Sequence, residues 1–122
     1  MKRIEEFTQN GRDFMYIDFS EIKSNNDFLE LIAVVEPVIA KYEKNSLNTI
    51  TNIENVRADS ESMRTVAKFL ENNKPYVNHG VIIGMDGIKK IMANTVFKMS
   101  GRGNLYFAFS KESAIELLLG LD

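Results

Sequence analysis

The chain has 122 residues, of which 44% are hydrophobic and 10% aromatic, and its formal net charge is −2. This length and composition suit one folded domain with one core, which we expect to span residues 1–122. The small acidic charge gives no general attraction to nucleic acid, which usually binds a basic surface. Because the sequence contains no cysteine, disulfides, thiol catalysis and cysteine-bound zinc are excluded.

No segment is typical of secretion or of membrane insertion. The first six residues become acidic before any apolar run begins, which is unlike a secretory signal. The most apolar stretch, residues 29–40, is too short to span a bilayer and is interrupted by Glu30, Glu36 and Pro37. We therefore expect a cytoplasmic protein that is not embedded in a membrane.

The chain is predicted to open with a β-hairpin. Asn10-Gly11 lies between two runs, 3–8 and 12–19, and this dipeptide readily takes the positive φ angles of a tight type I′ turn. In the second run both alternating faces are largely apolar, as in a strand that is covered on both sides.

A helix is predicted next. Asp27, followed by Glu30 three residues later, is typical of the start of a capping box, and apolar residues then recur at helical spacing from Leu31 to Tyr42. Pro37 removes one backbone hydrogen bond inside this run, so we expect the helix to kink or split there.

The remaining chain alternates strands and helices. We expect strands over 47–53, 80–85 and 105–109, and helices over 60–73, 86–100 and 111–119. The predicted helix starts are Asp59 with Ser60, Asp86, and Ser110, and the last helix should end with Gly120 at its C-cap. The order β-β-α-β-α-β-α-β-α predicts an α/β fold with a four- to five-stranded, mostly parallel sheet and about four helices.

The loops that follow parallel strands meet at one edge of the sheet and usually carry function. The candidate binding residues at this edge are Asp18, Asn52, Asp59, Asp86 and Gly87. Helix N-termini there could attract an anion, but the carboxylates would oppose it. The same carboxylates could hold Mg²⁺, as in a response-regulator receiver, but the paired acids and the strand-end lysine of a receiver are missing. We therefore expect helix caps, with no metal and no cofactor.

Three further features have a structural and a functional interpretation. The segment 84–87 resembles a tight turn more than a phosphate-binding loop, and the lone His79 has no catalytic neighbour in the sequence. A loose basic group could dock a partner, although a solvated helix face is the simpler account; the group consists of Lys89, Lys90, Lys98 and Arg102. Ser60 and Ser62 begin a predicted helix, where an added phosphate would be favourable although acids flank it, and capping is the simpler role.

Several segments resemble the STAS-like family, in particular the branch related to anti-sigma-factor antagonists and lipid-transfer-like domains. The resemblance extends from about Tyr16 to Leu119 and rests on the following segments: 16–20, 45–52, 74–77, 81–91, Phe107 and 110–118. It implies a sheet flanked by helices and a regulatory role without catalysis. In the antagonists a serine before the second major helix is phosphorylated. The matching segment 52–62 differs from their Asp-Ser-Ser-Gly signature, has Asn52 where relatives often have Asp, and offers Ser60 as the nearest equivalent.

The leading hypothesis is thus a non-catalytic regulatory or signalling module that binds a protein partner. The alternative is a domain of the same fold that binds a small apolar or anionic ligand, or a lipid. An enzyme is disfavoured because the sequence shows no nucleophile, base and orienting group together. A homodimer through the edge strand 3–8 stays open, although its charged residues are typical of an edge protected from pairing.

Overall fold

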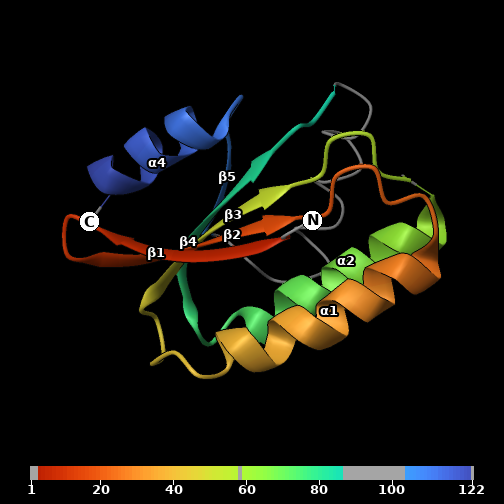
Figure 1. Ribbon diagram of the computed structural model, residues 1–122, viewed down its shortest axis with the longest axis horizontal. Helices are drawn as coiled ribbons and strands as arrows, with labels where there is room; N and C mark the ends of the chain where they lie inside the picture. The colour runs from red at the N-terminus through yellow and green to blue at the C-terminus, as the bar shows by residue number, and fades with distance from the viewer. Residues whose placement is uncertain (1–2, 58, 87–103, 122) are drawn as a thin grey trace.

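The computed structural model describes residues 3–57, 59–86 and 104–121 and confirms the α/β class (Figure 1). The elements in chain order are β1 (Ile4–Gln9), β2 (Arg12–Asp18), α1 (Asn25–Ile39), β3 (Leu47–Asn52), α2 (Ser60–Asn73), β4 (Val77–Ile83), β5 (Leu105–Phe107) and α4 (Lys111–Gly120). The helix predicted over 86–100 falls, except for its first residue, outside the described residues. No helix in the described part of the chain combines the length and the apolar character needed to cross a bilayer.

The strands form one sheet in the order β1-β2-β3-β4-β5. Strand β1 is antiparallel to β2, and each later neighbour is parallel. At the hairpin tip Asn10 and Gly11 have φ angles of 52° and 75°, which confirms the predicted turn with two positive φ angles. The mostly parallel sheet with an N-terminal hairpin is therefore as the sequence indicated.

The strand order determines which face of the sheet each helix covers. Consecutive parallel neighbours joined by right-handed crossovers place all their crossover helices on the same face. Figure 1 shows α1 and α2 side by side on one face and α4 alone on the other. Strand β2 is consequently covered on both sides, and its neighbouring residues Phe14 and Met15 are both fully buried.

Two hydrophobic clusters fill the two sides of the sheet. Beneath α1 and α2 the cluster includes Met15, Ile17, Phe28, Val35 and Leu70. Beneath α4 a smaller cluster consists of buried residues from three strands and one helix: Phe14, Ile50, Val81, Ile83, Ala114 and Leu118. Because β2, β3 and β4 are held from both faces, the ends of these strands form a rigid base for the loops that follow them.

Charged side chains hold α4 near both ends. The Arg12 guanidinium donates to the carbonyl oxygens of Leu118 (2.8 Å) and Leu121 (2.7 Å) at the C-terminal end of the helix, where a positive charge is favourable. Near the other end the Lys111 ammonium group pairs with the carboxylate of Glu5 on β1. The C-terminal helix is thus attached to the hairpin that begins the chain.

Three predictions about helix ends are wrong in detail. Helix α1 is capped by Ser24, whose hydroxyl accepts from the backbone N–H of Asp27 at 3.2 Å, so Asp27 lies in the first turn. The helix is not split at Pro37, because this residue lies in the last turn and α1 ends at Ile39. Gly120 is the last residue of α4 and not its cap; the C-cap is Leu121 in an extended conformation.

The bounds of strands β4 and β5 also differ from the prediction. Strand β4 begins at Val77 and not at residue 80, because Val77 and His79 pair with β3 across a register shift. Strand β5 ends at Phe107, two residues earlier than expected. Because β5 ends at Phe107, Phe109 lies outside the sheet.

Candidate functional site

The ends of four strands meet at one edge of the sheet, as predicted. In the parallel registers Asp18 is opposite Asn52, Asn52 is opposite Ile83, and Ile82 is opposite Phe107. The loops that start at these positions therefore lie next to one another. We call this region, residues 18–22, 52–57, 84–86 and 108–110, the strand-end edge.

The loops after β2 and β3 are hydrogen bonded to each other beyond the strands. Phe19 N–H donates to the carbonyl of Asn52, and Glu21 N–H donates to the carbonyl of Glu54, each at 2.9 Å. The Asn55 amide donates to the Glu21 carboxylate at 2.8 Å. Glu21 and Asn55 have φ angles of 67° and 56°, a conformation that non-glycine residues adopt only where their surroundings hold them. This part of the edge is therefore well ordered by its own contacts.

Asp18 and Asn52 support these loops with their polar atoms. The Asp18 carboxylate accepts from the backbone N–H of Ser20 at 2.9 Å. Asn52 Oδ1 accepts from the N–H of Glu54 at 2.9 Å, while its Nδ2 donates to the hydroxyl of Tyr16 at 3.0 Å. Both candidate binding residues thus make local contacts that shape turns, so the structure gives them a positioning role.

Gly84 allows the loop after β4 to approach the loop after β3. Its φ angle is 82°, and a Cβ atom built there would lie 2.7 Å from Asn52 Oδ1 and 2.7 Å from the backbone nitrogen of Glu54. Any side chain larger than hydrogen would push these groups apart. The turn role predicted for Gly84 is therefore accompanied by a close contact that the sequence pattern did not indicate.

The start of α2 contains the candidate regulatory serines. Asp59 is the N-cap, as predicted, and its carboxylate accepts from the N–H of Ser62 at 2.9 Å and pairs with Arg57. These contacts, the backbone hydrogen bond first, hold the pKa of Asp59 below its ordinary value. Ser60 is exposed at the first helical position, whereas Ser62 is fully buried. In this conformation Ser60 is accessible for modification and Ser62 is not, which argues against the candidate role of Ser62.

Phe109 is the feature of this edge that the sequence did not single out. It was expected to end the last strand and to join the core, but its side chain is 100% exposed. Its neighbours are both held: Ala108 N–H donates to the carbonyl of Ile82 at 3.1 Å, and Ser110 forms a reciprocal capping box with Ser113. An apolar residue just before an N-cap ordinarily packs onto the first turns of the helix, and Phe109 makes no such contact. Its position next to the Ser110 cap was the signal that it lies outside the strand.

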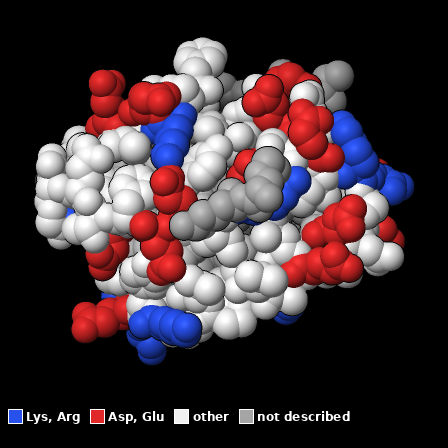
Figure 2. Space-filling view, viewed as in Figure 1, with Lys and Arg blue, Asp and Glu red and all other residues white. Residues whose placement is uncertain are grey.

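The charges around this edge are mainly acidic. Glu21, Glu54 and Asp86 are exposed there, and Glu112 follows in the first turn of α4. The described basic side chains nearby bind within the molecule: Lys23 to a carbonyl of the next loop, Arg57 to Asp59, Arg3 to two carbonyls and Lys111 to Glu5. Figure 2 shows acidic side chains on the right, near the ends of β2 and β3, together with a group of basic side chains.

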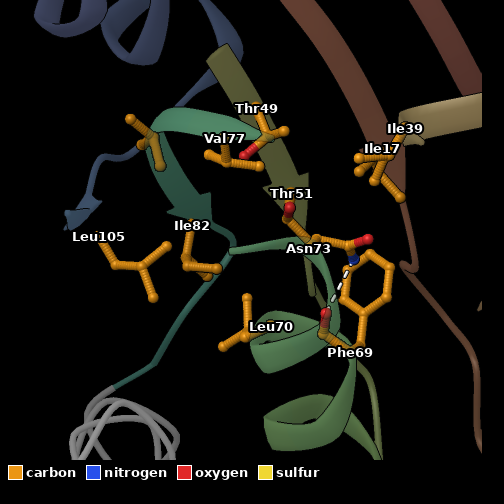
Figure 3. Close-up of a pocket in the computed structure, with 11 residues that line it drawn as sticks. Ile17, Ile39, Thr49, Thr51, Phe69, Leu70, Asn73, Val77, Ile82 and Leu105 are labelled. Carbon is orange, nitrogen blue, oxygen red and sulfur yellow. Dashed lines mark hydrogen bonds between the residues drawn. The ribbon is translucent and has the colours of Figure 1, made fainter. Parts of the chain in front are cut away.

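The void enclosed between the sheet and α2 is too small for an organic ligand. A buried void beneath β3 and β4 has a volume of about 10 Å³ and is lined by Thr49, Thr51 and Asn73 among apolar side chains (Figure 3). The Asn73 amide donates to the carbonyl of Phe69 at 2.8 Å and does not point to a ligand. Such a void holds about one water molecule, whereas organic ligands occupy hundreds of Å³. Among the described residues, no three His, Asp or Glu side chains are placed so that they could hold a metal ion.

Several candidate residues remain without a structural test. Asp86 is described and exposed, but Gly87 and the basic group Lys89, Lys90, Lys98 and Arg102 lie outside the described residues. His79, for which no catalytic role was expected, lies in β4 against the ring of Tyr106, with centroids 5.7 Å apart. No protein-family model matches the chain, and no match is found among curated proteins.

Proposed function

We propose that this protein is a non-catalytic regulatory module that binds a protein partner at the strand-end edge, with Phe109 as the anchor of the contact. The observation that carries the proposal is the complete exposure of the Phe109 ring. A single exposed apolar residue needs no explanation by itself. Phe109 differs because hydrogen bonds hold the residues on both sides of it and so keep its backbone in place just before α4.

The chemistry of the edge supports a protein as the partner. Rigid aromatic side chains that enter a pocket on the partner account for much of the affinity of protein interfaces. The surrounding loops present backbone and carboxylate groups on ordered turns, and the charges there are mainly acidic. We infer a partner surface with an apolar pocket rimmed by basic side chains.

The resemblance to the STAS-like family agrees with this proposal. It implies regulation through binding and places a phosphorylatable serine before the second major helix. Ser60 is exposed at this position, next to the Asp59 cap. We propose Ser60 as the site at which a phosphate, introduced beside two acids, would alter partner binding by adding negative charge.

The test compares partner capture by the wild-type protein and by Phe109→Ala, with Gln9→Ala at the distant hairpin tip as the control. Phe109→Ala should leave the thermal midpoint unchanged, because the lost side chain contacts solvent only. It should weaken binding of a captured partner by about 30-fold, the loss of about 2 kcal/mol expected for an aromatic hot spot. A partner bound equally well by both variants would refute the role of Phe109.

Failure to find any specific partner would count against a protein-binding function as a whole. If a partner is captured, its titration with the wild-type protein and with Phe109→Ala tests the role of Phe109 alone, so failure of the location and failure of the function are distinguishable.

A further inference from the structure

Helix α1 exposes apolar side chains to solvent in addition to those that it buries against the sheet. Its inner face buries four residues, Phe28, Ile32, Val35 and Ile39. On its outer side Leu29 is 48% exposed and Val34 is 57% exposed. Ala33 and Pro37 are exposed as well, beside the exposed acids Asp27 and Glu30. A surface helix usually carries polar residues outward, so several exposed apolar residues on one helix mark a candidate contact surface.

The shape around α1 fits an elongated partner. A groove between α1 and α2 has a volume of about 490 Å³, and Leu29, Ile32 and Phe69 provide apolar lining. A second groove of about 390 Å³ runs along the other side of α1 and is lined in part by Leu31 and Val34. Helix α1 is therefore a ridge between two grooves, and helices pack by placing ridges of one into grooves of another.

The charged residues of α1 and α2 indicate what kind of partner would bind this face. The charged residues of α1 are all acids, namely Asp27, Glu30 and Glu36. Across the groove α2 contributes Arg64 and Lys68, which are exposed and four residues apart on the same side of the helix. Neither basic residue takes part in an ion pair among the described residues. One acid of α2, Glu61 near its start, also lines the groove.

This face is complementary to itself. A partner must supply apolar surface, basic groups for α1 and acidic groups for Arg64 and Lys68, and a second copy of the chain supplies all three. Because α1 and α2 are successive crossover helices, they run in the same direction, and a two-fold axis parallel to them places α1 of each copy over α2 of the other. The acidic side chains of α1 in each copy then face Arg64 and Lys68 of the other copy.

We propose that two copies of this chain associate through the α1–α2 face, with the α1 ridge of each copy in the α1–α2 groove of the other and Glu30 near Arg64 across the interface. A helix of 15 residues is about 22 Å long, and two helices side by side are about 20 Å wide. A face of this size is at the small end of specific interfaces, so we expect a weak dimer that depends on concentration.

Sedimentation velocity of the full chain from about 1 to about 500 μM tests the proposal, because a weak dimer shifts with concentration over this range. The wild-type protein should change from monomer to dimer. Leu29→Asp should remain monomeric throughout, since it places a charge in the apolar contact. A wild-type protein that stays monomeric, or a dimer that survives Leu29→Asp, would overturn the proposal.

Charge reversal tests the pairing of the helices. Glu30→Lys and Arg64→Glu should each weaken the dimer by about tenfold, and the double variant should restore it, because opposite charges then face each other again. Glu112→Lys on α4, on the other face of the sheet, is the matched control and should have no effect. A double variant weaker than both single variants would overturn the proposed arrangement. Circular dichroism confirms that each variant is folded. This inference is independent of the role of Phe109, and Phe109→Ala should leave the dimer unchanged.

Discussion

Replacing Gly84 by alanine should destabilise the protein by about 3 kcal/mol, of which about 1 kcal/mol is the cost of a left-handed conformation for alanine and the rest is steric. The φ angle of Gly84 is 82°, and the added Cβ would lie 2.7 Å from Asn52 Oδ1. This oxygen cannot move freely, because it accepts a hydrogen bond from the N–H of Glu54, and the Asn52 amide also donates to Tyr16. The steric cost therefore includes strain in, or loss of, these contacts.

Gly11 provides a matched control. Its φ angle is 75°, close to that of Gly84, but nothing lies within 4 Å of a Cβ built there. Gly11→Ala should thus cost about 1 kcal/mol from conformation alone. Urea denaturation measures both variants, and with a slope of about 2 kcal/mol per molar their midpoints should differ by about 1 M. If Gly84→Ala costs no more than Gly11→Ala, the argument from close approach at the strand-end edge is refuted.

Three further changes test the core, the attachment of α4 and the cap of α2. Phe28→Ala should lower the free energy of unfolding by about 4 kcal/mol in urea denaturation, because the ring is fully buried between α1 and the sheet. Arg12→Ala should cost about 1–2 kcal/mol and increase hydrogen exchange in α4, because the carbonyls of Leu118 and Leu121 lose their charged donor. The pKa of Asp59 is lowered on folding, so its ionised form stabilises the protein above pH 3.8, and this contribution is lost as the pH falls through the folded value. Asp59→Asn, which retains a capping side chain, should therefore be less stable than the wild-type protein at pH 7, and the difference should become smaller at pH 3.

Each of these predictions has a result that would contradict it. Phe28→Ala can be compared with Leu29→Ala on the exposed side of the same helix, and equal losses would contradict the assignment of the core. Unchanged exchange in α4 of Arg12→Ala would show that the helix does not depend on these hydrogen bonds. A stability difference for Asp59→Asn that is the same at both pH values would mean that the charge of the carboxylate has no role.

Most of the fold could be predicted because local signals and hydrophobic periodicity agree along the chain. The Asn10-Gly11 turn, the Asp59 cap and the start of the last helix at Ser110 depend on interactions between residues that are close in sequence. The error at the start of α1 has the same origin. Ser24 and Asp27 are both good caps, and only the extended conformation of Ser24 selected between them.

The candidate site was only partly predictable. That Asp18, Asn52 and Asp59 would lie at the strand-end edge follows from the alternation of strands and helices. What their side chains do there does not, because the hydrogen bonds that occupy them depend on the conformation of the turn that follows each residue. The exposure of Phe109 was also hidden, since an aromatic residue after a strand is usually buried and the strand ends two residues earlier than its pattern suggested.

The sequence by itself determined the α/β class, the hairpin and most helix and strand positions, because turn chemistry and apolar periodicity act over a few residues. Only the tertiary structure decided which groups are available to a partner. The register of the parallel strands placed the loops side by side, the close contact at Gly84 tied two of them together, and the packing of α4 on the opposite face left Phe109 in solvent. These outcomes depend on contacts between residues far apart in the chain, whose geometry no local pattern contains.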